Sequence, residues 1–195
     1  MDKKKFISDS LNESSETKIN MLKECSEDIL SAVNIISDSY KEGKKLLLCG
    51  NGGSAADCQH IATEFMIRLS HHINRPALPA IALTTDSSNL TAGGNDIGFE
   101  NVFARNIEGL GNEGDVLITI STSGNSPNLL KAVEQAKSKG LKVIGFLGGS
   151  GGKLKALVNL PIIIPSSNTQ RIQEGHITTA HIICELVEDE LYGNS

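Results

Sequence analysis

Five short apolar runs, rich in leucine, isoleucine and valine, recur along the chain between longer segments with helical spacing of apolar residues. A strand that is covered on both faces is continuously apolar, so each run predicts a buried strand of a parallel sheet. The predicted strands lie at residues 45–49, 80–84, 116–120, 143–147 and 160–164. Helices are predicted at residues 54–69, 86–92, 99–107, 126–139, 152–157 and 169–192. This alternation indicates an α/β fold in which helices cover both faces of one sheet.

Residues 3–41 precede the first predicted strand and carry helical patterns without a glycine or proline. About two helices fit this stretch, which is more than one small sheet needs. Either they cover another subunit or they form an ordinary helix pair on the sheet. We therefore expect one domain over residues 1–195, with N-terminal helices over residues 1–41 and an α/β core over residues 42–195.

The composition narrows the class of protein and its compartment. The chain of 195 residues is long enough to bury a sizeable core, and its net charge of −5 lacks the basic footprint of a nucleic-acid-binding protein. No apolar run approaches the length of a membrane span and no secretory signal is visible, so we expect neither a membrane nor a nucleic-acid partner. The four cysteines form no C-x-x-C pair, which favours free buried thiols in a reducing cytoplasm.

A hydroxyl-rich loop follows the third predicted strand. It contains Ser121, Thr122, Ser123 and Ser126, and then Pro127, which suits the first turn of a helix that Ser126 caps. Hydroxyls and backbone N–H groups at a helix N-terminus form an anion site, because the helix dipole favours negative charge there. The loop contains no lysine or arginine, which favours a phosphate monoester on a small molecule over a polyphosphate with its metal.

Glycine-rich turns are the second kind of candidate site. Gly50-Asn-Gly-Gly-Ser54 follows the first predicted strand, and Ser54 is expected to cap the next helix. The run is neither a dinucleotide fingerprint nor a P-loop, and alone it is compatible with a simple packing turn. Together with the hydroxyl loop, at the same carboxyl edge of the sheet, it predicts a phosphosugar site. In a further glycine-rich loop, Asn95 and Asp96 are either turn formers or ligands of sugar hydroxyls.

Candidates for acid–base and metal chemistry lie on two predicted helices. His60 and Glu64 are four residues apart and therefore lie on one helix face. They are either a metal-binding or proton-transfer pair, or a polar pair on the surface. Gln173 and His181 are eight residues apart, about 12 Å along a straight helix, so their spacing alone does not make them co-ligands. The alternative for His181 is a core histidine whose hydrogen bonds are made within the protein. His176 is expected to be a helix cap or a surface residue.

These motifs together resemble those of the sugar isomerase (SIS) domain family and, within it, of the phosphoheptose isomerases. The motifs that carry the resemblance are Gly50-Asn-Gly-Gly-Ser54, His60-x-x-x-Glu64, Gly94-Asn-Asp96, Ser121-Thr-Ser-Gly-Asn-Ser126, and Arg171-Ile-Gln-Glu174 with His181. The resemblance runs from the N-terminal helices to the last helix. It implies a three-layer α/β/α fold with a five-stranded parallel sheet in flavodoxin-like order, and a homotetramer with active sites at subunit interfaces.

The resemblance also implies an activity and its residues. The expected reaction is the aldose–ketose isomerisation of D-sedoheptulose 7-phosphate to D-glycero-D-manno-heptose 7-phosphate, a heptose precursor for lipopolysaccharide or capsule. Glu64 and His181 are the implied proton-transfer pair. One zinc ion per subunit is implied, bound by His60, Glu64, Gln173 and His181. The implied substrate-binding residues are Asn51, Gly52, Gly53, Ser54, Glu64, Asn95, Asp96, Ser121, Thr122, Ser123, Ser126 and Gln173.

A non-catalytic relative is the alternative function. The DnaA initiator-associating factor resembles these enzymes in fold and loops but lacks their acid–base pair. Glu64, His181 and the complete loop over residues 121–126 are present in this chain, which favours the enzyme. The chain departs from the family pattern at Gln170, where some members carry an aspartate, so any role of that aspartate is not carried over.

Overall fold

Five parallel strands form a sheet in the order β2-β1-β3-β4-β5. In the computed structural model, which describes residues 1–193, the strands are β1 (Leu46–Gly50), β2 (Ala80–Ala82), β3 (Val116–Ser121), β4 (Lys142–Gly148) and β5 (Leu160–Ile164). The helices are α1 (Lys3–Glu24), α2 (Ser26–Lys41), α3 (Gly53–Met66), α4 (Ser87–Asp96), α5 (Val102–Leu110), α6 (Pro127–Ser138) and α7 (Thr169–Tyr192), with 3₁₀ turns η1 (Phe99–Asn101) and η2 (Leu154–Ala156). The flavodoxin-like strand order is confirmed.

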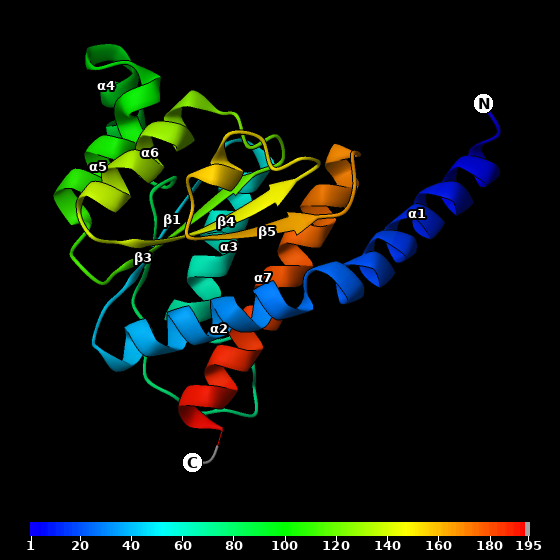
Figure 1. Cartoon of the computed structure of the whole chain (residues 1–195), viewed down its shortest axis with the longest axis horizontal. Coiled ribbons are helices and arrows are strands. Elements are labelled where there is room, and N and C mark those ends of the chain that lie inside the picture. The colour runs from blue at the N-terminus through cyan, green and yellow to red at the C-terminus, as the bar shows by residue number, and fades with distance from the viewer. Residues whose placement is uncertain (194–195) are drawn as a thin grey trace.

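Burial on both faces of the sheet explains the continuous apolar runs, because successive residues of a strand point to opposite faces. In β1, Leu46 and Leu48 belong to one buried cluster, whereas Leu47 and Cys49 belong to the other. Helices α2, α3 and α7 complete the first cluster, and α5 and α6 complete the second. Figure 1 shows these helices on either side of the strands, which confirms the expected three-layer architecture.

The strand order places two of the candidate loops next to each other. β1 pairs in parallel with β3, and Gly50 is aligned with Ile120 at the carboxyl ends of the two strands. The chain leaves β1 toward β2 on one side, and β3 continues toward β4 on the other. In open α/β sheets, ligands bind where the strand order reverses in this way. The loops after β1 and β3 therefore flank the expected binding edge.

Helix α1 projects from the body of the molecule, and its N-terminal half is far from the sheet (Figure 1). Only Thr17 and Met21 of this helix are buried. Five of its apolar side chains are 55–74% exposed: Phe6, Ile7, Leu11, Ile19 and Leu22. The more C-terminal part of α1 lies against α7, where the Ser14 hydroxyl donates to Glu174 at 2.7 Å. The two N-terminal helices thus differ, because α2 is packed on the sheet and α1 is largely unpartnered.

Several local expectations were wrong in detail. Ser54 does not cap α3; Gly52 precedes the helix with φ of +55°, and Ser54 is buried in the first turn. Asn95 and Asp96 lie in the last turn of α4, not in a loop, because this helix continues through Gly93 and Gly94. Residues 152–157 contain only the 3₁₀ turn η2. Ser126 does occupy the N-cap position of α6, but its side chain makes no capping hydrogen bond.

Cys25, Cys49, Cys58 and Cys184 are all free and buried, as expected. Burial raises the pKa of the Cys49 thiol to about 12, so this thiol remains protonated at neutral pH. Within residues 1–193, none of the helices has the combination of length and apolar character needed to cross a bilayer.

Candidate active site

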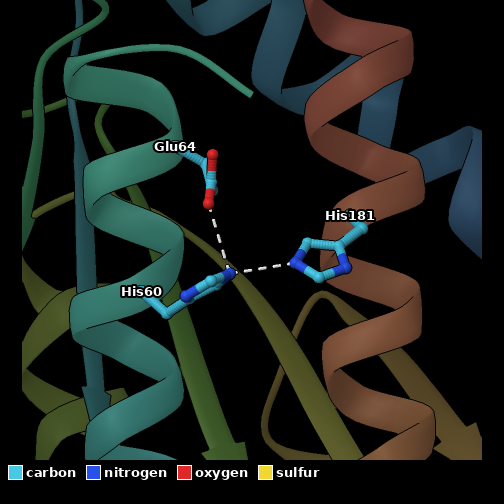
Figure 2. Close-up of side chains that lie close together, drawn as sticks. All are labelled: His60, Glu64 and His181. Atoms are coloured by element: carbon cyan, nitrogen blue, oxygen red, sulfur yellow. Dashed lines mark hydrogen bonds and ion pairs between the residues drawn. The ribbon is translucent and has the colours of Figure 1, made fainter. Parts of the chain in front are cut away.

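Three side chains from two helices meet between α3 and α7. The Nε2 atom of His60 lies 2.9 Å from the Nε2 atom of His181 and 3.2 Å from Oε1 of Glu64. Figure 2 shows His60 and Glu64 on α3, with His181 facing them from α7. The helical spacing of His60 and Glu64 thus does bring them together, and the tertiary fold adds a histidine that is 121 residues away in sequence.

The three residues differ in their exposure to solvent. The side chain of His60 is 48% exposed, whereas that of Glu64 is 14% exposed. His181 is partly buried, so it is neither a surface residue nor a core histidine enclosed by apolar groups. The carboxylate of Glu64 is thus largely shielded from water, whereas the imidazole beside it is half exposed.

The donor atoms of this cluster fit a divalent metal ion. One atom from each of His60, Glu64 and His181 can be chosen so that all three lie within 4.8 Å of one another. Neighbouring ligands of a tetrahedral zinc ion lie about 3.4 Å apart, given bonds of about 2.0–2.1 Å to nitrogen and oxygen. The observed separations of 2.9 and 3.2 Å are close to that value. Two imidazoles and a carboxylate are also a donor set that zinc accepts when it keeps an open position.

Gln173 lies against the first glycine-rich loop. A Cβ atom added to Gly53 would be 2.8 Å from Nε2 and 3.5 Å from Oε1 of Gln173. A residue larger than glycine at position 53 would therefore displace the amide. Gln173 and His181 lie on the same helix, and the amide of Gln173 lies against Gly53, where the loop after β1 meets α3. Its role as a metal ligand stays a prediction.

The loop after β1 is fixed by an amide pair that the sequence reasoning missed. Nδ2 of Asn51 donates to Oδ1 of Asn128 at 3.0 Å, and Nδ2 of Asn128 donates back to Oδ1 of Asn51 at 2.8 Å. Asn128 is buried in the first turn of α6. The pair joins the loop after β1 to the first turn of α6. Asn51 is thus held by the protein itself, at the edge of the predicted sugar site.

The hydroxyl loop after β3 is shaped by internal hydrogen bonds. The N–H of Gly124 donates to Oγ of Ser121 at 3.0 Å, and Ser121 is buried. Gly124 has a φ of +65°, and its carbonyl accepts a hydrogen bond from the N–H of Leu154 at 3.0 Å. Thr122 and Ser126 are partly buried and Ser123 is exposed. Ser121 therefore supports the turn, while the other hydroxyls remain accessible to an anion.

A cavity of about 300 Å³ lies beside this loop. Thr122 and Ser123 line one side, and Ser150, Ser167 and Thr169 add three further hydroxyls. These three residues were missed by the sequence reasoning. They follow β4 and β5, and carboxyl ends of parallel strands share one edge of the sheet. Hydroxyls that follow any strand of the sheet are therefore candidates, whereas only those after the first and third predicted strands were named from the sequence.

Asn95 and Asp96 are both exposed at the end of α4, where Nδ2 of Asn95 donates to Oδ1 of Asp96 at 2.7 Å. Among the described residues, neither makes a hydrogen bond to the His60–Glu64–His181 cluster or to the two loops. Their contact with a sugar stays a prediction that needs either a bound substrate or another subunit.

His176 is neither a cap nor a surface residue, contrary to expectation. It is 1% exposed, and its Nε2 atom lies 3.0 Å from the carbonyl oxygen of Leu147 in β4. Burial lowers the pKa of His176 to about 4, and the hydrogen bond to Leu147 opposes that change only in part. His176 is thus a neutral structural histidine. Nearer the cluster, burial raises the pKa of Asp57, while the adjacent His60 opposes the rise.

Comparison with known proteins gives consistent matches over nearly the whole chain. The model of the SIS domain matches residues 11–148. A phosphoheptose isomerase of Clostridium acetobutylicum is 52% identical over 192 residues, covering 97% of both chains. That of Burkholderia pseudomallei strain K96243 is 49% identical, covering 96% of this chain and 95% of the relative.

Solved structures agree with these sequence matches. A phosphoheptose isomerase from Francisella tularensis superposes with a TM-score of 0.93 and 37% identity, over 97% of this chain and all of the other. One from Neisseria gonorrhoeae gives a TM-score of 0.89 and 39% identity, over 95% and 98% of the two chains.

Proposed function

We propose, since this chain belongs to the SIS domain family and to its phosphoheptose isomerases, that it interconverts D-sedoheptulose 7-phosphate and D-glycero-D-manno-heptose 7-phosphate. The observation that supports this most directly is that Glu64 and His181 both lie within about 3 Å of Nε2 of His60, in a chain that also has two loops suited to a phosphosugar. The relatives in the comparison are named as isomerases, which supports an enzyme over the non-catalytic interaction protein.

Proton transfer falls to Glu64 and His181 in this proposal. Aldose–ketose isomerisation moves a proton between C1 and C2 through an enediol, and a second proton between the two oxygens. Glu64, shielded and next to two imidazoles, removes the proton from one carbon and returns it to the other. His181 exchanges the proton of the oxygens. Each general acid or base contributes about 10²–10⁴-fold to such a reaction.

The phosphate serves as a handle that positions the reacting carbons. Thr122, Ser123 and Ser126 would bind it together with Ser150 and Thr169, which share the adjoining cavity. Ser121 would keep the turn in shape through Gly124. The loop over residues 51–54 and Gln173 would line the sugar, with Asn95 and Asp96 at its more exposed side. This arrangement separates the binding of the anion from the chemistry at the other end of the substrate.

One zinc ion per subunit would be held by His60, Glu64 and His181, with Gln173 as the predicted fourth ligand. When bound, zinc supplies a Lewis acid that polarises the substrate's carbonyl group. A neutral imidazole binds a metal and a protonated one donates a proton, so His181 does not perform both tasks at the same moment. An amide oxygen is a weaker ligand than a thiolate or an imidazole, which favours an exchangeable metal site.

The proposed assembly is a homotetramer with active sites at its subunit interfaces, in the cytoplasm. The exposed apolar side chains of α1 support an oligomer, because such a helix is otherwise left with an uncovered apolar face. The product would supply heptose for lipopolysaccharide or capsule. The whole chain, residues 1–195, would form a single SIS domain with N-terminal helices over residues 1–41.

Incubation with candidate substrates in D₂O tests the proposal. Sedoheptulose 7-phosphate and other ketose phosphates are offered to metal-free and zinc-loaded protein, and NMR follows both aldose formation and deuterium at C1 and C2. We expect turnover of the heptulose phosphate with exchange at these carbons. Binding of the sugar phosphate without any exchange would contradict the enzyme and favour the interaction protein.

A further inference from the structure

A buried ion pair lies at the end of α3, apart from the loops of the substrate site. Arg75 and Glu188 have side chains that are 0% and 1% exposed, and Nη2 of Arg75 lies 2.6 Å from Oε1 of Glu188. The Nε–H of Arg75 donates to the same oxygen at 2.8 Å. Removing two charges from water is costly unless geometry and hydrogen bonding are excellent, so such a pair is weak evidence of stability alone.

The guanidinium of Arg75 also caps the C-terminal end of α3, the helix that carries Glu64. Nη2 donates to the backbone carbonyl of Glu64 at 2.8 Å, and Nη1 donates to that of Phe65 at 2.8 Å. Carbonyls in the last turn of a helix lack partners within the helix, and a cation there is favoured by the dipole. Arg75 therefore binds the backbone of the very residue whose carboxylate faces His60.

Glu188 connects this helix end to α7. Its two carboxylate oxygens accept the N–H groups of Leu69 and Ser70 at 3.2 and 3.0 Å, in the segment that follows α3. Glu188 lies seven residues after His181 on the same helix, about 10 Å along the axis and nearly in line with it. The pair thus spans the two helices whose side chains form the His60–Glu64–His181 cluster.

We propose that Arg75 and Glu188 are positioning residues for this cluster: they fix the spacing of α3 and α7 so that Glu64 and His60 meet His181. The inference rests on the proposed function, since it concerns the same metal and acid–base groups. A metal site requires its ligands to be held within a few tenths of an ångström, and groups behind the ligands provide that restraint. Arg75 and Glu188 bind each other and backbone groups, and among the described residues neither makes a hydrogen bond to the side chains of His60, Glu64 or His181.

Zinc affinity of the metal-free protein is the readout that separates positioning from general stability. Chelator competition measures it for wild type, Arg75→Lys and Glu188→Gln, with kcat and KM measured in parallel. We expect zinc affinity to fall about 10- to 100-fold, the range found when groups supporting metal ligands are removed. We expect kcat to fall with it, while KM for the sugar phosphate changes little because the phosphate loops are untouched.

Two further variants make the test decisive. Ile107→Ala removes a buried side chain from the opposite face of the sheet and should destabilise the protein without changing zinc affinity. Arg75→Met with Glu188→Leu replaces the ion pair by apolar groups, which often preserves folding where single changes do not. A folded double variant, or either single variant, with wild-type zinc affinity would overturn the inference. A wild-type protein that binds zinc but does not isomerise would overturn the proposed function alone.

Discussion

Glu64 and His60 are in contact but differ in burial, and this difference suits them to different proposed roles. Glu64 is mostly covered and its backbone is bound by Arg75, whereas nearly half of the His60 side chain is exposed. The carboxylate is therefore fixed and shielded, as a base for carbon-bound protons must be. His60 has the freedom to admit a metal ion or a substrate between the two helices.

Replacing Glu64 by glutamine removes the base and preserves the shape of the side chain. We expect kcat to fall at least about 10²-fold, the lower range for loss of a general base, with sugar phosphate still bound. Initial rates and isothermal titration calorimetry measure the two effects separately. Glu108→Gln on the exposed face of α5 is the matched control and should have wild-type activity. A Glu64→Gln enzyme with most of its activity would refute the assignment.

His176 should make the folded state sensitive to acid. Its pKa is about 4 in the folded protein and 6.5 in a free side chain, so the unfolded chain binds more protons between these values. The buried, neutral imidazole therefore contributes fully to the free energy of unfolding above pH 6.5. About 3 kcal/mol of that free energy is lost as the pH falls toward 4. Urea unfolding at pH 7.5 and 4.5, at one protein concentration, measures this loss. In His176→Phe the loss should be smaller; an equal loss would place the acid sensitivity elsewhere.

At the scale of elements, the turn after β3 depends on backbone geometry that only glycine allows. Gly124 has a positive φ, and a Cβ atom there would overlap the carbonyl oxygen of Gly151. The loops after β3 and β4 are in this way packed against each other. Their contact brings Thr122 and Ser123 to the same cavity as Ser150.

Gly124→Ala should therefore disturb the anion site without reaching the acid–base cluster. We expect KM for the sugar phosphate to rise more than kcat falls, because the turn that presents the hydroxyls must shift. Steady-state kinetics measure both quantities. Gly109→Ala is a suitable control, since this helical glycine has open space around its Cβ position and alanine favours a helix. Equal kinetic effects of the two substitutions would contradict this role of Gly124.

Sequence patterns predicted most of the elements because each depends on local chemistry. The buried strands were visible as apolar runs, and the predicted β5 and α7 match the observed bounds. The start of α3 was misplaced, because serine is preferred over glycine as an N-cap and Ser54 lies two residues after Gly52. The last turn of α4 was predicted as a loop because glycines disfavour helices. In the structure, Val102 lies so close to Gly93 that a Cβ atom there would be 2.9 Å from its side chain, which explains a glycine inside this helix.

The site was predictable only where its residues are close in the chain or share a strand end. His60 and Glu64 follow from helical spacing, but no local rule brings His181 to them across 121 residues. The family resemblance made that connection. The pairs Asn51–Asn128 and Arg75–Glu188 were missed for the same reason, since each joins distant elements through buried polar groups. Such contacts follow from the packing of α3, α6 and α7 on the sheet.

At the scale of the whole molecule, α1 connects an exposed apolar surface to the proposed substrate site. Arg171 of α7 donates to the backbone carbonyl of Ser10, and Nδ2 of Asn168 donates to the carboxylate of Glu13 at 3.0 Å. These contacts fix α1 to the N-terminus of α7, which carries Thr169 and Gln173. Subunits that associate through α1 would therefore also stabilise the part of α7 that borders the cavity.

Charges placed on the exposed face of α1 test the assembly and its effect on the site. In Ile7→Glu with Leu11→Glu, two side chains that are 58% and 64% exposed become charged, while the subunit's own core is untouched. We expect dissociation to folded monomers and a loss of activity, because burying two unpaired carboxylates in an interface is strongly unfavourable. Light scattering gives the mass, and circular dichroism confirms the fold.

Ser8→Glu with Asn12→Glu adds the same charge to polar positions of the helix and controls for net charge. A wild-type monomer at all concentrations would contradict the proposed tetramer; an intact oligomer in the Ile7/Leu11 variant would place the interface away from this face of α1.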